Sequence, residues 1–405
     1  MKYVQIPVAM LELGKLLPID VWDSNGLLLL RKGQVILSQQ HKEMLSLRRA
    51  SVSANDEQAW QKIHERRTQS LQDNGVEEKL EARTTLQTAQ LEANCLSRRE
   101  LLSGWLELQK ILRGLLYEGK SAVSPLERLD FIETKALVLL RTNPDECLFI
   151  LFQALADVSL SYCTTHALLT AVVCELTAEN IGMTEPAKRV LFRSALAMNI
   201  GMAQAQDNLA TLSETSTEIH RKLVRDHPQK SLEILKKFCV TDEDELDIVR
   251  WHHELDESSG LAKNLESRRL LRMADGFVAK MAARKTRLAT SQLGAAKSIF
   301  LGAPADTLKL GAAMATAVGF YPPGTYVQLV NGEKSVSVAR GMRANIPHVV
   351  SIVNPGGMPL GKYLYRDTTD PKFAIRSPLN AEKIKVKVML EELLKARMEH
   401  ASTPR

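Results

Sequence analysis

Four of the nine histidines stand in positions where they could bind a metal: His166, His227, His252 and His253. The last two are adjacent, and an acid, Glu254, follows them. Two neighbouring imidazoles can converge on one cation where a helix ends and the backbone bends. Neutral imidazole suits zinc, iron, nickel and copper. A lone histidine on a helix is more often structural, so the adjacent pair carries more of the prediction than any single histidine.

The order of these residues along the chain strengthens the prediction. His227-Pro228 is expected to open a helix, because proline is well tolerated in a first turn. The histidine pair follows about 25 residues later, and Asp275 lies about 22 residues beyond it. Three imidazoles with one open position are a recognised zinc arrangement. One divalent transition metal (zinc, manganese or iron) could be held, with no bound metal as the alternative, by this set of candidate ligands: His166, His227, His252, His253 and Asp275.

Two arginines follow the aspartate and could bind an anion. Arg284 and Arg287 are three residues apart, so on a helix they share a face. An unbroken helix would turn that face away from Asp275 by roughly 120–180°. The arginines can therefore serve the same ligand as Asp275 only if the helix ends or bends between them. Forked cations beside a metal would suit a phosphodiester, and the alternative is a solvated basic face.

Residues 1–54 have the pattern of a small β-rich module. Two apolar segments, 19–22 and 27–30, flank Asn25-Gly26, which favours a tight hairpin turn. A second turn is expected at Gly33, and a short helix is expected over 39–48. Residues 55–96 are rich in charged residues and glutamine, which indicates a long exposed helix, a helix pair or a solvated connector.

Residues 97–320 carry apolar residues at helical spacing and predict the largest domain. Leu101, Trp105, Leu108 and Leu112 form one such face. Pro125 and Pro144 suit helix starts, and 149–176 is typical of a buried helix pair. In the C-terminal segment, 321–405, strands are expected over 326–330, 336–339 and 348–353, and a polar helix over 381–398. The fold class is therefore mainly α, with small β-rich modules at both ends.

Composition limits the classes of function. A formal charge of +6 and 5% aromatic residues give too weak a basic and stacking surface for nucleic acid. The five cysteines form no C-x-x-C pair, which is typical of reduced cytosolic thiols. The apolar run around 147–156 is too short to span a membrane. We expect a cytoplasmic protein with a protein partner or a homodimeric assembly.

Over roughly residues 140–300 the chain resembles the HD-GYP domain family of bacterial signalling proteins. The family carries an early helix histidine, a His-Asp doublet followed by Ile-Gly-Lys, a His-Pro step, a His-His-Glu run near Gly-Tyr-Pro, an Ala-Asp helix and a downstream arginine-containing stretch. The resemblance implies a helical HD-domain bundle, bound metals and the hydrolysis of cyclic di-GMP. The matching positions here are His166, His227-Pro228, His252-His253-Glu254, Ala274-Asp275 and the pair Arg284 and Arg287.

The departures from that pattern fall on the metal-binding machinery. Met198-Asn199 stands where the family has the His-Asp doublet, and Met202 replaces the lysine. The segment 260–262, Gly-Leu-Ala, replaces Gly-Tyr-Pro, and Tyr162 replaces a glutamate that some members use as a ligand. No catalytic residue can therefore be assigned.

The electrostatic consequence of lacking the acidic doublet can be estimated. Two dications ~4 Å apart repel by on the order of 16 kcal/mol at an effective dielectric constant of about 20. A bridging carboxylate offsets part of that repulsion, whereas Asn199 is neutral and the Met198 thioether is a soft ligand. A full two-metal centre is not expected. One metal held by three imidazoles and a metal-free cleft of hydrogen-bonded remnants both stay open.

Three functions follow from these alternatives. The favoured one is a regulatory or binding pseudoenzyme of cyclic di-GMP signalling, which would bind cyclic di-GMP or a protein partner. The second is an active metal-dependent phosphodiesterase with a reduced metal site. The third is a protein-interaction scaffold, in which the β-rich modules and the charged segment over 55–93 carry the function.

Overall fold

The computed structural model describes residues 77–381 except 158–160, 212–216, 255–257 and 283–304, with the backbone alone over 77–97. Outside that span it describes short stretches of the first 56 residues and parts of 384–397. Within these residues, no helix is both long and apolar enough to cross a bilayer. The chain divides into two compact units, Met1–Ser97 and Arg98–Arg405. The four-part division expected from the sequence stays a prediction.

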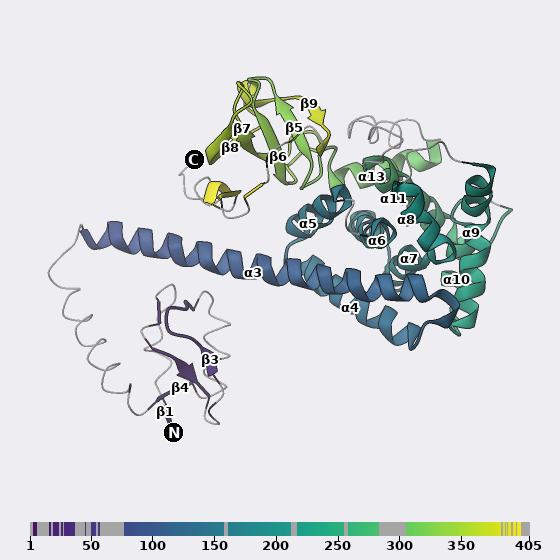
Figure 1. The fold of residues 1–405 in the computed structure, drawn as a ribbon, viewed down its shortest axis with the longest axis horizontal. Helices are drawn as coiled ribbons and strands as arrows, with labels where there is room; N and C mark the ends of the chain where they lie inside the picture. Colours follow the sequence, from purple (N-terminus) through teal and green to yellow (C-terminus); the bar gives the residue numbers. More distant parts are fainter. Residues whose placement is uncertain are drawn as a thin grey trace. The chain divides into compact units, whose positions relative to one another are not determined.

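The first unit contains a small antiparallel sheet (Figure 1). Its strands are β1 (Tyr3–Gln5), β2 (Val21–Trp22), β3 (Leu28–Leu30) and β4 (Ser51–Ser53), in the order β1-β4-β2-β3. The predicted hairpin is confirmed, because β2 pairs with β3 and Gly26 takes a φ of 83° in the turn. A second turn forms at Gly33. The helix expected over 39–48 lies almost wholly outside the described residues.

Helix α3 (Glu77–Glu118) runs through the boundary between the two units. Its predicted apolar face is confirmed: Leu101, Trp105, Leu108 and Leu112 are all buried. Two further helices, α4 (Pro125–Thr142) and α5 (Pro144–Ala156), begin at the prolines that the sequence predicted as helix starts. Proline fits there because the first turn needs no N–H donor.

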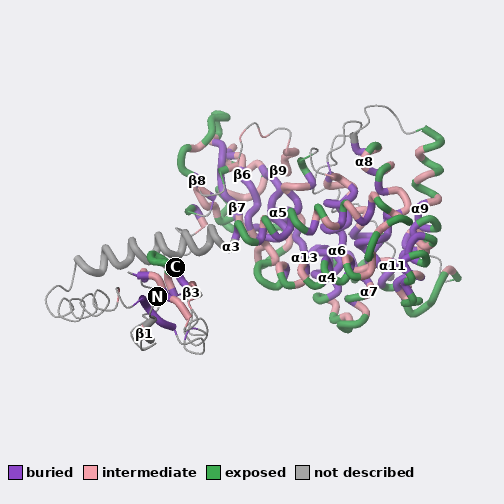
Figure 2. The backbone as a smooth tube through the Cα atoms, turned by 60° about the horizontal axis from the view of Figure 1, so that its bottom comes forward, coloured by how far each residue is buried: buried purple, intermediate pink, exposed green. Residues whose placement is uncertain are grey.

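The second unit is a helical bundle around α6 (Tyr162–Asn180), which Figure 2 shows as buried along its length. Residues 163–178 of α6 are buried on every side, because its apolar residues are spread around the helix and not confined to one face. The mainly helical fold class is confirmed. The remaining helices are α7 (Glu185–Ala197), α8 (Ala203–Thr211), α9 (Glu218–Lys237), α10 (Glu243–Trp251), α11 (Leu265–Met281) and α13 (Ala305–Val318).

A five-stranded antiparallel sheet follows the helices, in the order β8-β7-β6-β5-β9. The three predicted strands are confirmed, and two further strands were not predicted. Phe149 of α5 lies in the core of this sheet, and Arg340 forms an ion pair with Asp145 at 2.6 Å. The five strands are β5 (Tyr326–Leu329), β6 (Lys334–Ala339), β7 (His348–Val353), β8 (Pro359–Asp367) and β9 (Ile375–Leu379).

The prediction of a terminal helix over 381–398 is wrong for the first half of that range. Ile384, Val386 and Val388 are not helical, and they pack against the core of the C-terminal sheet. Their alternation with lysine has a period of two, which suits an extended segment with one apolar side. Helix is present only further on, at 392–393 and 395–397 among the described residues.

Candidate metal centre

His227 lies in the middle of a helix, which corrects the prediction that His227-Pro228 opens one. Helix α9 begins after Thr217, whose side chain accepts a hydrogen bond from the backbone N–H of His220. Pro228 is therefore inside the helix. The capping box at Thr217 marks the true start, and it satisfies backbone donors that a proline eleven residues later does not affect.

His252 lies immediately after α10, at the position that caps its C-terminal end. The histidine pair therefore stands where a helix ends, the position from which two neighbouring imidazoles can converge on one cation. The last carbonyls of a helix lack intrahelical donors, and the Nδ1–H of His252 donates to the carbonyl of Val249 at 2.8 Å. The next residue, His253, is fixed from α11, because Arg272 donates to its carbonyl oxygen at 2.6 Å.

The imidazoles of His227, His252 and His253 converge. One ligand nitrogen from each can be chosen so that all three lie within 4.8 Å of one another. The Nε2 atoms of His227 and His252 are 3.3 Å apart. The Nδ1 atoms of the same two rings donate to backbone carbonyls, at 2.5 Å for His227 and 2.8 Å for His252. Since a neutral imidazole carries one proton, both Nε2 atoms present lone pairs to each other.

Two facing lone pairs at that distance repel each other unless a cation or proton lies between them. Burial lowers the pKa of His227 to about 4, and burial together with the neighbouring His253 lowers the pKa of His252 to about 3. Burial also lowers the pKa of His253. All three rings are therefore neutral near pH 7, the form that binds metals. The donor set fits a divalent transition metal bound through three nitrogens.

The carboxylate of Asp275 forms a hydrogen-bonded pair with His166. The Nε2 atom of His166 lies 2.7 Å from Oδ1 of Asp275, and its Nδ1 lies 3.2 Å from the hydroxyl of Tyr162. Burial opposes ionisation of Asp275, but the hydrogen bond with His166 outweighs it and holds the pKa of Asp275 well below its usual range. The structure thus separates the five predicted ligands into a histidine trio and a carboxylate–histidine pair beside it.

Met198 and Asn199 lie at the end of α7 and are both buried. Met198 belongs to the main hydrophobic core, and Asn199 Nδ2 has no hydrogen-bond partner among the described residues. Met202 closes the short 3-10 turn Ile200–Met202 that follows and is half-buried. Met198 and Asn199 are therefore part of the interior, and neither side chain offers an imidazole or a carboxylate to a metal.

The turn after Asn199 packs directly on α9. A Cβ atom on Gly201 would lie 2.7 Å from the carbonyl oxygen of His227 and 2.7 Å from the backbone nitrogen of Ser231. The Ser231 hydroxyl donates to the Met198 carbonyl at 2.7 Å and accepts from the Gly201 N–H at 3.0 Å. Only glycine allows this close approach, so Gly201 and Ser231 fix the turn against the helix that carries His227.

The segment 260–262, which the resemblance aligned with Gly-Tyr-Pro, is held by two buried charged side chains, Asp247 and Arg268, that were not predicted. Asp247 accepts from the Leu261 N–H at 2.8 Å and from Asn264 at 3.0 Å. Arg268, which is fully buried, donates to the carbonyls of Ser259 and Leu261. Gly260 lies between them with a φ of 67°, and a Cβ there would come within 2.4 Å of Asp247. No local sequence motif indicates this arrangement, because Asp247 and Arg268 lie on different helices, α10 and α11.

The arginine pair Arg284 and Arg287 lies outside the described residues. Helix α11 ends at Met281, and Ala282 is extended with a ψ of 132°. The helix therefore ends between Asp275 and the two arginines, which is required if these residues are to serve the same ligand. Their role toward an anion stays a prediction.

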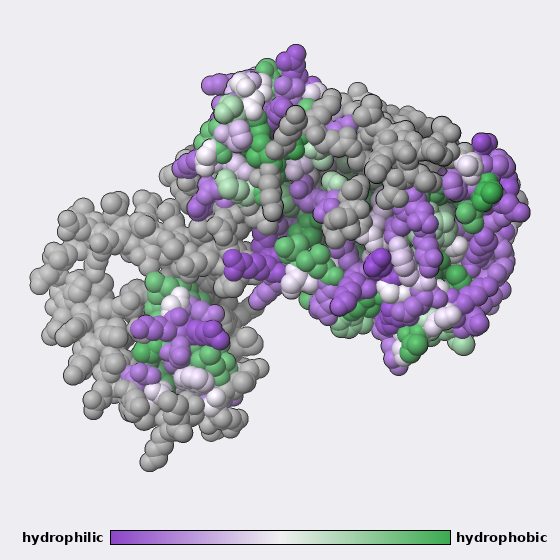
Figure 3. Space-filling model, in the orientation of Figure 1, coloured by the Kyte–Doolittle hydropathy of each residue, from purple (hydrophilic) through white to green (hydrophobic). Residues whose placement is uncertain are grey.

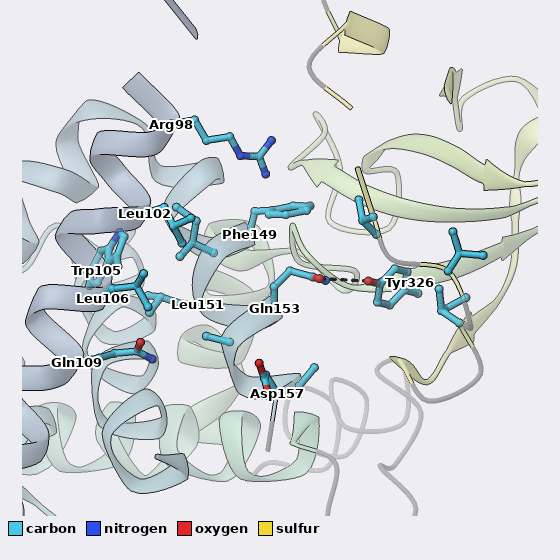
Figure 4. Close-up of a pocket in the computed structure, with 16 residues that line it drawn as sticks. Arg98, Leu102, Trp105, Leu106, Gln109, Phe149, Leu151, Gln153, Asp157 and Tyr326 are labelled. Carbon is cyan, nitrogen blue, oxygen red and sulfur yellow. Dashed lines mark hydrogen bonds between the residues drawn. The ribbon is translucent and has the colours of Figure 1, made fainter. Parts of the chain in front are cut away.

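A separate cavity of about 660 Å³ lies between α3, α5 and the C-terminal sheet. Figure 4 shows Arg98 above the ring of Phe149, and Gln153 bonded to Tyr326 across the cavity. Its described lining residues include none of the candidate metal ligands. On the face of the second unit that Figure 3 shows, hydrophobic side chains gather in small patches among hydrophilic ones.

No family model and no curated protein matches the chain. Among solved structures it is similar to Bd1817, described as an HDG"Y"P protein from Bdellovibrio bacteriovorus, with 15% sequence identity and a TM-score of 0.40. That likeness covers 77% of this chain and 98% of the other. At this score it supports neither a family assignment nor a role for any residue.

Proposed function

We propose that this chain is a degenerate HD-GYP-like protein that binds one divalent transition metal and acts as a regulatory or binding pseudoenzyme in cyclic di-GMP signalling. The single observation that carries the proposal is the pair of Nε2 lone pairs of His227 and His252, 3.3 Å apart in a buried site. A metal at that position would satisfy both rings, and His253 would supply a third nitrogen.

The absence of efficient hydrolysis rests on the carboxylates. A two-metal hydrolase uses an anionic ligand to hold its cations together. Asp275 lies beside the trio but is bonded to His166, and the neutral Asn199 stands where the bridging acid would be. The chain's own residues can hold one cation and orient three imidazoles. They supply too little negative charge for a second cation.

The metal proposal is tested by atomic emission analysis and zinc or manganese titration of purified protein. We expect one metal per chain, and we expect His252→Ala to lower the affinity by at least 100-fold. His348→Ala is the matched control, because His348 lies in β7 of the C-terminal sheet, away from the trio. Unchanged metal content in His252→Ala would refute the assigned site.

The ligand proposal is tested separately by calorimetric titration with cyclic di-GMP. We expect binding of the intact nucleotide without its linearisation over hours. No heat at high micromolar concentration would remove nucleotide binding and leave a protein-interaction role. Brisk linearisation that disappears in His252→Ala would instead establish the alternative, a phosphodiesterase with a reduced metal site.

A further inference from the structure

Pro228 leaves one backbone carbonyl of α9, a turn earlier in the helix, without its usual backbone donor. In an α-helix the N–H of each residue bonds to the carbonyl four residues earlier. Proline has no N–H, so the carbonyl of Val224 lacks its usual donor although α9 continues to Lys237. An unsatisfied carbonyl inside a helix is costly and normally finds another partner.

The partner that it finds is His227. The Nδ1 atom of His227 lies 2.5 Å from the Val224 oxygen. This bond requires the proton to be on Nδ1, which leaves the lone pair on Nε2, the atom that faces His252. His252 reaches the same state in another way, because its acceptor, Val249, is in the last turn of α10 and lacks a donor through the ending of the helix.

We infer that Pro228 is a positioning residue for the metal centre: by removing one helix hydrogen bond it reserves the Val224 carbonyl for His227 and fixes the tautomer in which Nε2 can bind a metal. This inference rests on the proposed function for its purpose, but the tautomer itself does not depend on a metal. Pro228 offers no metal-binding atom of its own and acts through the neighbouring His227.

A purely structural role for Pro228 predicts a different result. If the proline only shaped the helix, its replacement would leave the histidine tautomer unchanged. Under our inference, Pro228→Ala restores an N–H that competes for the Val224 carbonyl. Helix stability should then hold or rise, because proline is the least favourable residue in a helix interior, while metal affinity falls. A loss of affinity without a loss of stability is what marks a positioning residue.

The test combines three measurements on the full chain. Long-range proton–nitrogen spectra of the metal-free protein should show His227 protonated on Nδ1 in the wild type and partly on Nε2 in Pro228→Ala. Zinc titration should show affinity reduced about 10- to 100-fold, the range seen when an outer partner of a ligand is lost. The melting temperature should be equal to or above that of the wild type. Gln229→Ala, an exposed neighbour in α9, should change none of these.

Two outcomes would overturn the inference. One is a wild-type His227 protonated on Nε2, which needs no variant to observe. The other is the same tautomer and affinity in Pro228→Ala as in the wild type, and Pro228→Gly restores the N–H if the alanine variant does not fold. If the wild type binds no metal but shows the Nδ1 tautomer and its shift in Pro228→Ala, the proposed function fails and the positioning inference stands.

Discussion

At the scale of single residues, the sequence indicates which histidines could share a metal, but not which nitrogen of each ring carries the proton. The adjacent pair His252-His253 is visible in the sequence, and the structure brings both rings to His227. Which ring nitrogen carries the proton depends on the carbonyls of Val224 and Val249. Their availability depends on where each helix is interrupted or ends, and no spacing rule reports that.

The neutral side chain of Asn199 leads to a prediction at the same scale. Asn199→Asp, alone or with Met198→His, supplies an anionic ligand beside α9 and offsets part of the repulsion between two cations. We expect metal content to rise from one towards two per chain, measured by atomic emission after dialysis against manganese. The single variant is the milder change, because aspartate and asparagine have nearly the same shape, whereas Met198 lies in the hydrophobic core.

The control for this prediction is Asn208→Asp, an exchange of the same kind on α8, away from Met198-Asn199 in the sequence. It should leave the metal content unchanged. A wild-type chain that already holds two metals would contradict the prediction and the charge argument behind it.

At the scale of elements, the sequence predicted the apolar face of α3, the starts of α4 and α5, the buried helix pair over 149–176 and three strands of the C-terminal sheet. The start of α9 was misplaced because proline was taken as a first-turn residue, whereas Thr217 and His220 form the cap. Strands β8 and β9 were missed. In β8 most residues are exposed or half-buried, so the strand lacks the apolar alternation that identified its neighbours.

The segment 258–264 beside the histidine pair should depend on Arg268. Arg268→Ala leaves the carbonyls of Ser259 and Leu261 without the buried guanidinium that donates to them. A hydrogen bond to a charged group contributes about 1.5–3 kcal/mol, so we expect a loss of about 1.5–3 kcal/mol in urea unfolding and faster amide exchange in this segment. Glu266→Ala, an exposed change on α11, is the control. Full stability in Arg268→Ala would show that the segment is held by other contacts.

The C-terminal sheet should lose stability in acid through Glu333. Burial opposes its ionisation, but Arg366 and Ser351 outweigh burial and hold the pKa of Glu333 at about 2, below its ordinary value of 4.5. A depressed folded pKa stabilises the fold above the unfolded pKa. The contribution is therefore full above about pH 4.5 and is lost as the pH falls towards 2.

Glu333→Gln should cost about 1.5–3 kcal/mol near pH 7, the range for hydrogen bonds to charged groups. It should also flatten the pH dependence of unfolding between pH 4.5 and 2. Chemical denaturation across that range measures both effects. Glu392→Gln, whose partner Lys395 is largely exposed, is the control and should change little. An equal acid sensitivity in wild type and Glu333→Gln would exclude this ion pair as the cause.

At the scale of the whole molecule, the sequence predicted a helical body with β-rich ends, and the structure has that composition. The first unit has its own small core, which includes Val21, Ile36 and Val52. The main core belongs to the helices of the second unit, and Phe149 links that unit's helices to its sheet. Every residue of the candidate metal centre lies in the second unit. Separate cores allow the two units to unfold in separate cooperative steps.

Metal binding should therefore stabilise the second unit against unfolding and leave the unfolding of the first unit unchanged. A ligand that binds only the folded state stabilises it by RT ln(1 + [L]/Kd), about 2.7 kcal/mol at a hundredfold excess over Kd. In calorimetry we expect two transitions, with zinc raising the melting temperature of the larger one alone, because all three imidazoles belong to the second unit. His252→Ala should abolish that rise and leave the smaller transition unchanged. A zinc-dependent shift of the smaller transition would mean that the first unit contributes to the metal site, and the mononuclear centre of three histidines would then be incomplete as described.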